Sequence, residues 1–229
     1  MSRIHPAENT QQDYLSIENG DHINRPSPSV LTVWKRSSMT FQGTDGFTVF
    51  DSHGTLAFRV DNYTRKSPCS TGGLVLMDGT GKALLSLKPQ ILSMQLQWNA
   101  YRGGEDECGK SSRLFAMRRP ISLINNSSKY EAEIFIGGPT KGSQPTPDFR
   151  IEGSFARRNC KIIKTSTSSP SGQVLVAKIS RKKVNKTVML NDDVFSLQVQ
   201  PGFDLQLIMA FVVVLDRICR KPFAPVLCS

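Results

Sequence analysis

The sequence predicts a mostly β protein, a closed antiparallel barrel of about twelve strands that encloses a hydrophobic C-terminal helix. Two observations lead to this prediction. From Val30 onward, short β-branched and aromatic segments alternate with turn-forming residues, as in antiparallel sheets. Near its end, the chain contains one continuous apolar run, "LQLIMAFVVVL", over residues 205–215. A helix that is apolar on every face must be surrounded by protein, and the inside of a barrel provides those surroundings.

The two ends of the chain differ from this pattern. Residues 1–29 are polar, show no hydrophobic period and finish in "RPSPS", so we expect a flexible N-terminal arm there. The arm lacks the apolar core of a secretion signal and the Arg-rich pattern of a transit peptide. This favours the cytoplasm, with the plasma-membrane surface and the nucleus as alternatives. Because strand-like segments continue without a linker, we expect a single domain over residues 30–221 and a short tail over 222–229.

Hairpin signals define the first strands. In "FTVFDSHGTLAFRV", two strand-like segments flank the turn residues 51–54, which predicts a β-hairpin. The stretch "LVLMDGTGKALLSL" repeats this plan around residues 78–82. In "QLQWNAY", the apolar residues Leu96, Trp98 and Ala100 alternate with polar neighbours, as expected for a strand with one face toward a core.

The second half continues in the same style. Its strand-like segments are "RLFAMR", "KYEAEIFI", "DFRIEG", "FARRNCKII", "GQVLVAKIS" and "DVFSLQV". The stretches "RGGEDECGKSS", "GGPTKGSQPTPD" and "KTSTSSPSG" between them are rich in Gly, Ser, Thr and Pro. They are typical of exposed loops between strands of one domain.

The apolar run near the end is predicted to be a helix. Asp204 is a good N-cap after the helix breakers Pro201 and Gly202, and Arg217 and Arg220 suit the last turn by offsetting its partial negative charge. The apolar part is about half of the roughly 20 residues that a membrane-spanning helix needs, so we expect no transmembrane segment.

Lengths support the enclosed position of this helix. A helix over residues 204–220 would rise roughly 25 Å, and a strand of about seven residues rises about 23 Å, so the helix is about as long as a barrel is tall. A closed barrel also leaves no sheet edge exposed. A β-sandwich with the helix packed on its outside is the alternative that the sequence leaves open.

Catalytic and metal-binding patterns are weak in this sequence. The five cysteines are scattered without the short paired spacing of a zinc or redox motif, and the three histidines are isolated. The "GTGK" stretch at residues 79–82 lacks the upstream glycine and the following Ser or Thr of a phosphate loop, so a hairpin turn is the better interpretation. We therefore expect no metal, no cofactor and no enzymatic activity.

The formal net charge of +10 favours a polyanionic partner such as nucleic acid, anionic lipid or phosphoprotein. The candidate lipid- or polyanion-binding residues, chosen by charge alone, are Arg118, Arg119, Arg157, Arg158, Arg181, Lys182, Lys183 and Lys186. Taken singly, each is more often a solvated strand end. No helix-turn-helix, zinc finger or basic zipper is present, so we expect no sequence-specific DNA binding. Single-stranded nucleic acid stays open, because basic and aromatic residues interleave in "FARRNCKII".

Four stretches together carry a family resemblance. They are "VWKRSSMTFQGTDGFTVFDSHGTLAFRVDNY", "LVLMDGTGKALLSLKPQILSM", "IEGSFARRNCKI" and "FSLQVQPGFDLQLIMAFVVVLD". In this order, and over about residues 30–220, the chain resembles the plant LURP-one-related proteins, which belong to the Tubby C-terminal-like superfamily together with the phospholipid scramblases. The resemblance implies a twelve-stranded barrel around a central hydrophobic helix, which agrees with the prediction from the residues.

The resemblance implies less about activity. It suggests a non-enzymatic binding module that docks on anionic phospholipid or phosphoinositide and acts in plant defence signalling. Tubby domains bind phosphoinositides through surface Lys and Arg residues, but those positions cannot be aligned to this chain. The alternative is a transcription-linked or protein-interaction scaffold without lipid affinity, whose partners are proteins.

Overall fold

A computed structural model describes residues 26–36, 46–61, 73–90, 96–103, 113–120, 130–137, 146–165, 172–183, 185 and 189–219. Structural statements in the text refer to these ranges. The predicted tail over 222–229 and residues 1–25 of the predicted arm lie outside them, as do Lys186 and Arg220.

In the described part of the chain, twelve strands form one antiparallel sheet that closes on itself, and one helix follows them. The strands are β1 (Ser29–Arg36), β2 (Gly46–Phe50), β3 (Leu56–Asp61), β4 (Leu74–Asp78), β5 (Ala83–Gln90), β6 (Gln97–Arg102), β7 (Arg113–Arg118), β8 (Tyr130–Ile136), β9 (Phe149–Ser154), β10 (Asn159–Thr165), β11 (Gln173–Arg181) and β12 (Val194–Val199), and the helix is α1 (Leu205–Cys219). The predicted closed barrel is confirmed, and the sandwich alternative does not hold.

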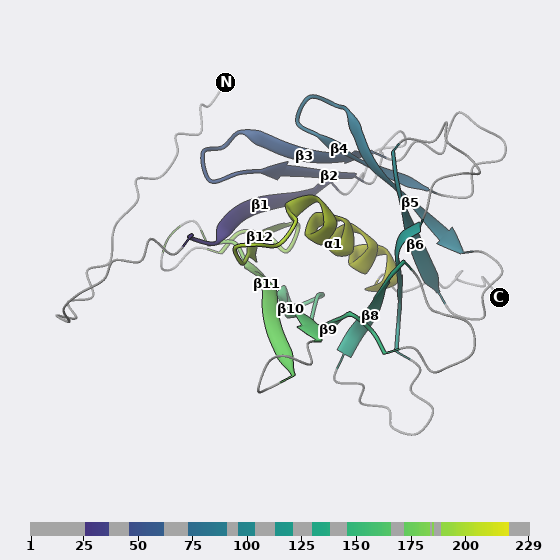
Figure 1. Ribbon diagram of the computed structural model, residues 1–229. Helices are drawn as coiled ribbons and strands as arrows, with labels where there is room; N and C mark the ends of the chain where they lie inside the picture. The colour runs from purple at the N-terminus through teal and green to yellow at the C-terminus, as the bar shows by residue number, and fades with distance from the viewer. Residues whose placement is uncertain are drawn as a thin grey trace, which may run out of the picture.

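Pairing follows the order of the sequence. Each strand pairs with the next one, and β1 pairs with β12 to close the barrel around α1 (Figure 1). The register of the closing pair places Leu31 opposite Leu197 and Val33 opposite Phe195. All four side chains are buried, so the closing seam contributes to the core as the other pairs do.

Two predicted hairpins are present, and each is closed by an aspartate. The Asp51 carboxylate accepts hydrogen bonds from the backbone N–H groups of His53 and Thr55, both at 2.8 Å. The Asp78 carboxylate accepts 2.9 Å bonds from the N–H groups of Thr80 and Lys82. Both turns contain a glycine with positive φ, at positions 54 and 81, which is a conformation that side chains disfavour.

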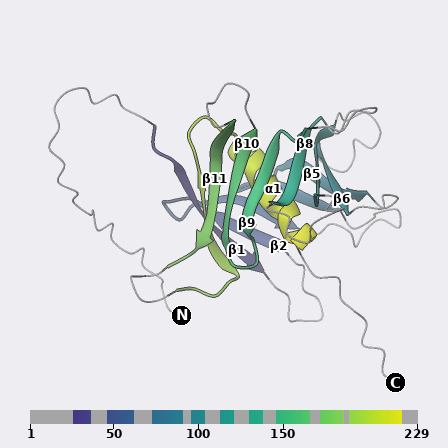
Figure 2. The same cartoon turned by 90° about the horizontal axis from the view of Figure 1, so that it is seen from below.

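Helix α1 begins as predicted from its capping residue. The Asp204 carboxylate accepts hydrogen bonds from the N–H groups of Gln206 at 2.8 Å and Leu207 at 3.4 Å. The helix then runs along the inside of the barrel, with β9, β10 and β11 on one side of it (Figure 2). Arg217 lies in its last turn, where a cation offsets the helix dipole.

The core of the barrel surrounds the middle of α1. Phe211 and Val213 have no exposed surface, and the Phe211 ring lies 4.8 Å from that of Phe115 and 5.3 Å from that of Phe149. The strands complete this core, because every second side chain along a strand points toward the inside of the barrel. Within the described residues, no helix has the length and apolarity needed to cross a membrane.

Candidate functional site

The antiparallel topology sorts the nominated cations to one end of the barrel. Strands β7, β9 and β11 all run toward the end at which α1 finishes, so the residues that follow them meet there. We call this end the cationic rim. The nominated cations at this end are Arg118, Arg119, Arg157, Arg158, Arg181, Lys182 and Lys183. Segments that are far apart in the sequence therefore share one rim, which the sequence interpretation did not establish.

The opposite end of the barrel is built differently. It carries the turns at Asp51 and Asp78 and the start of α1 at Asp204, and we call it the turn rim. Asp148 belongs to it too, because its carboxylate accepts a 2.8 Å hydrogen bond from the N–H group of Ile136. Each of these carboxylates is hydrogen-bonded to the backbone.

Arg158 is buried, which corrects its interpretation as a surface cation. Its backbone has a φ of 51°, and the side chain is only 6% exposed. The guanidinium lies 4.2 Å from the ring centre of Phe155 and 4.3 Å from that of Phe195, and its Nε donates a 2.8 Å hydrogen bond to the carbonyl of Asp192. Arg158 therefore holds the barrel end together and cannot reach a partner outside it.

A buried ion pair joins the barrel wall to the helix at the same end. The Nζ atom of Lys35 lies 2.7 Å from a carboxylate oxygen of Asp216, whose side chain is 3% exposed. Burial lowers the pKa of Arg158, while the negative charges of Asp216 and Asp192 act in the opposite direction. The Asp216 carboxylate thus pairs with Lys35, and its charge also acts on Arg158.

Arg118 and Arg119 also make contacts within the protein. Arg119 donates a 2.8 Å hydrogen bond to the carbonyl of Ile218, one of the last carbonyl groups of α1. The guanidinium of Arg118 lies over the ring of Phe135 at 4.8 Å. Arg119 is nevertheless an exposed residue, so part of its side chain is accessible to solvent although its guanidinium caps the helix.

Four cations remain directed toward the outside. Arg157, Arg181 and Lys183 are exposed, and Lys182 is partly exposed. Arg181 lies 3.3 Å from the carboxylate of Asp192, an exposed pair of the kind that contributes little to stability. Among the described residues, no carboxylate pairs with Arg157, Lys182 or Lys183. These three side chains are the ones best placed to meet an external anion.

The cysteines at this end are unsuited to nucleophilic chemistry. The Cys219 thiol lies 3.3 Å from the Glu131 carboxylate, which also accepts a 2.9 Å hydrogen bond from the N–H group of Phe155. Burial raises the pKa values of Cys160 and Cys219 to about 12, and the Glu131 charge adds to both shifts. Both thiols therefore stay protonated at neutral pH, and a protonated thiol is a poor nucleophile.

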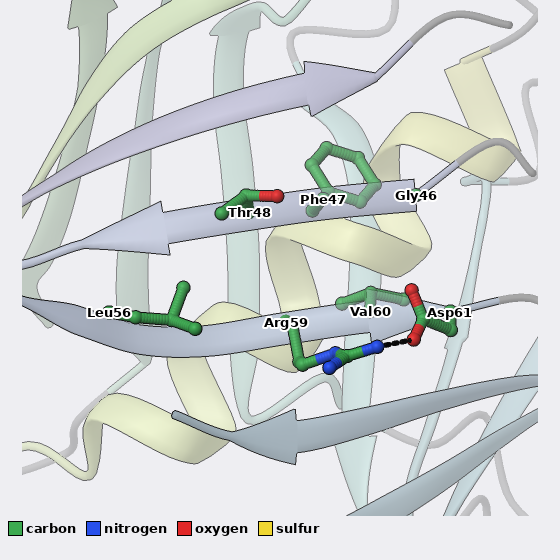
Figure 3. Close-up of a pocket in the computed structure, with 7 residues that line it drawn as sticks. All are labelled: Gly46, Phe47, Thr48, Leu56, Arg59, Val60 and Asp61. Atoms are coloured by element: carbon green, nitrogen blue, oxygen red, sulfur yellow. Dashed lines mark hydrogen bonds and ion pairs between the residues drawn. The ribbon is translucent and has the colours of Figure 1, made fainter. Parts of the chain in front are cut away.

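A small pocket opens between β2 and β3 (Figure 3). Its volume is about 150 Å³, and it is lined by Gly46, Phe47, Thr48, Leu56, Arg59, Val60 and Asp61. The guanidinium of Arg59 forms an ion pair with Asp61 inside this lining. The volume falls below the roughly 300–1,000 Å³ of typical small-molecule sites, so the pocket is a weak candidate for a ligand site.

The sequence interpretation missed the residues that close the cationic rim. Lys35 and Asp216 are 181 positions apart, so no local pattern connects them. One signal was available, because Asp216 is the single carboxylate in the helical segment 205–219 and a buried charge requires a partner. Within the described residues, no group of His, Cys, Asp and Glu side chains is arranged to hold a metal ion.

The fold and the rim together define a class of protein, an antiparallel barrel of twelve strands closed around its own C-terminal helix. The model of the LURP-one-related family matches residues 29–216. The chain belongs to the LURP-one-related family.

Individual relatives agree with this assignment. The chain is 39% identical to Protein LURP-one-related 5 of Arabidopsis thaliana over 82% of each chain. It is 33% identical to Protein LURP-one-related 8 of the same plant, over 96% of this chain and 100% of the relative. An X-ray structure of another Arabidopsis thaliana protein superposes with a TM-score of 0.56 at 23% identity, over 86% of this chain and 94% of that one. This last similarity concerns the fold.

Proposed function

We propose that the protein is a non-enzymatic binding module that docks on anionic phospholipid, including phosphoinositide, through its cationic rim. The observation that carries this proposal is the convergence of Arg157, Lys182 and Lys183 on one barrel end without carboxylate partners among the described residues. Each Lys or Arg close to an anionic membrane surface contributes about 1 kcal/mol to binding. A part in plant defence signalling stays a prediction from the family resemblance.

The cations of the rim fall into two groups, those with contacts inside the protein and those exposed to solvent. Lys35, Arg119 and Arg158 hold α1 and the strand ends in place, so their charges are used within the protein. Arg157 and Lys183 are exposed next to this fixed structure. Strand ends that are already held by internal contacts suit a surface that contacts a membrane, because docking then needs no rearrangement of the backbone.

Vesicle co-sedimentation tests the proposal. The parent should bind vesicles that contain phosphatidylserine or phosphoinositide and should ignore neutral vesicles, and binding should fall as salt shortens the Debye length. The variant Arg157→Glu/Lys182→Glu/Lys183→Glu should bind at least about a hundredfold more weakly, since three contributions of about 1 kcal/mol are lost.

A matched variant separates the rim from net charge. Lys161, Lys164 and Lys178 are exposed within β10 and β11, on the barrel wall and not beyond the strand ends, and reversing them to Glu changes the net charge by the same amount. This control should keep most of the binding. Equal losses in both triple variants would assign the effect to net charge alone. A parent that binds no anionic vesicle at low salt would leave the protein scaffold without lipid affinity as the better hypothesis.

A further inference from the structure

Large apolar side chains are exposed at the cationic rim, and three of them lie on β1 and in the segment that joins β11 to β12. Trp34 is 50% exposed, Met189 46% and Leu190 36%. We call these three residues the apolar edge. Exposing such side chains to water is unfavourable, and large apolar groups beside cations are a common feature of surfaces that contact membranes. The proposed electrostatic docking makes no use of them, so they need a separate explanation.

The apolar edge is interleaved with the cations. Beyond the end of β11, Lys183 forms a β-bridge with Met189, and the N–H group of Leu190 donates a 2.9 Å hydrogen bond to the carbonyl of Lys182. Each lysine of this short two-stranded segment thus has an apolar residue opposite it. A lysine beside an apolar group at a bilayer surface can extend its ammonium group to the phosphates while the apolar group enters the hydrocarbon boundary.

Trp34 lies on the strand next to this segment. It is opposite Val194 in the β1–β12 pair, and the N–H group of Lys35 donates a 2.8 Å hydrogen bond to the carbonyl of Asp193. The turn that follows Leu190 is therefore fixed beside Trp34. Tryptophan is enriched at membrane–water interfaces, because its ring is apolar and its N–H group can stay hydrated.

We propose that the apolar edge inserts into the interface of an anionic bilayer when the cationic rim docks. This inference rests on the proposed function and deepens it, since it selects a bilayer over a soluble polyanion as the partner. A soluble phosphorylated molecule gains nothing from Met189 and Leu190, whereas a bilayer offers phosphate and hydrocarbon within a few ångströms of each other.

Trp34 fluorescence provides a direct test. The chain has two tryptophans, and the other one, Trp98, faces the barrel interior and is 7% exposed. Anionic vesicles that carry brominated acyl chains should quench the parent and should leave Trp34→Phe unchanged. Co-sedimentation of the parent without quenching would overturn insertion and leave the proposed function standing. Failure to co-sediment at low salt would overturn both.

Variants of the other two residues complete the experiment. Met189→Ser/Leu190→Ser should weaken vesicle binding roughly tenfold or more and should remove the part of the binding that survives high salt. Its melting temperature should match the parent's, because both side chains are exposed. Val174→Ser/Leu175→Ser is the matched control, since these residues are 37% and 41% exposed at the turn rim. Equal loss in both variants would overturn the inference.

A binding experiment with a soluble anion distinguishes a bilayer from a soluble polyanion as the partner. Inositol hexakisphosphate should bind the parent and Met189→Ser/Leu190→Ser equally, because charge alone attracts it. If the double variant loses affinity for this soluble anion to the same extent as for vesicles, the residues act without a bilayer and the inference fails. Unchanged vesicle binding in the double variant would overturn it too.

Discussion

The two ends of the barrel satisfy their polar groups by different means. At the turn rim, the carboxylates of Asp51, Asp78 and Asp204 accept backbone hydrogen bonds from residues two to four positions away. At the cationic rim, Lys35 reaches Asp216 over 181 positions and Arg119 reaches the carbonyl of Ile218 over 99. The three aspartates of the turn rim thus act locally, although Asp148 reaches Ile136 over 12 positions, and the contacts of the cationic rim span far more of the chain.

This difference places the proposed binding surface at one end of the barrel and the locally closed turns at the other. In the turns, each carboxylate accepts hydrogen bonds from nearby backbone N–H groups, so few of its acceptor positions are left for an external partner. The cationic rim contains more cations than its internal contacts use, with Arg157, Lys182 and Lys183 exposed or partly exposed and without carboxylate partners among the described residues. The proposed docking surface is thus at the end where charge is in excess.

The substitution with the largest expected effect on stability is in the middle of α1, between the two rims. Val213 is fully enclosed, so Val213→Asp would place an uncompensated charge in the core at a cost of several kcal/mol, against a total stability of roughly 5–15 kcal/mol. We expect no folded protein, as judged by circular dichroism and gel filtration. Val213→Ile is the control and should fold. A soluble Val213→Asp variant with the parent's melting temperature would contradict the enclosed helix.

The second prediction concerns the buried pair at the cationic rim. Asp216→Ala leaves Lys35 without its carboxylate, removes a negative charge that acts on Arg158, and should cost about 3–5 kcal/mol. For a domain of this size, that loss lowers the melting temperature by roughly 10 °C. The double variant Lys35→Met/Asp216→Leu should recover much of the loss in calorimetry. A single variant as stable as the parent would show that the ion pair does not hold the rim.

The same contrast explains which features the sequence could predict. The hairpins at Asp51 and Asp78 and the cap at Asp204 depend on a few neighbouring residues, so their patterns were sufficient. The enclosed helix followed from its apolar composition and its length. For Leu96 the prediction from the sequence is wrong. The alternation with Trp98 placed Leu96 on the inner face of a strand, whereas it precedes β6 and is 52% exposed.

The candidate site was predictable in composition and unpredictable in detail. Arg157 and Arg158 are adjacent and chemically identical, yet one is exposed and the other is buried between two rings. Arg158 also has a positive φ, which is uncommon for a residue other than glycine, and the residue type gives no sign of this conformation. Long-range contacts such as that of Arg119 with Ile218 require the closed barrel before they exist.

A third prediction compares the two ends of the helix. Asp204→Ala removes the N-cap and should cost about 1 kcal/mol, which lowers the melting temperature by roughly 3 °C. Asp204→Ser should retain most of the stability, since a hydroxyl oxygen also caps. The effect should be several times smaller than that of Asp216→Ala in the same calorimetric series. A larger loss at Asp204 would reverse the proposed ranking of the two rims.

The smallest expected effect is a pH dependence at the turn rim. The hydroxyl of Thr80, with the N–H groups of Thr80 and Lys82, lowers the pKa of Asp78 from its ordinary value of 3.8. A lowered pKa in the folded state means that the stabilising contribution is present above about pH 4 and disappears as the pH falls through the folded value. Asp78→Asn should therefore have a slightly lower melting temperature than the parent at pH 7, and the difference should shrink below pH 4. A difference that stays constant down to pH 2 would show that the turn is held by its shape and not by the carboxylate charge.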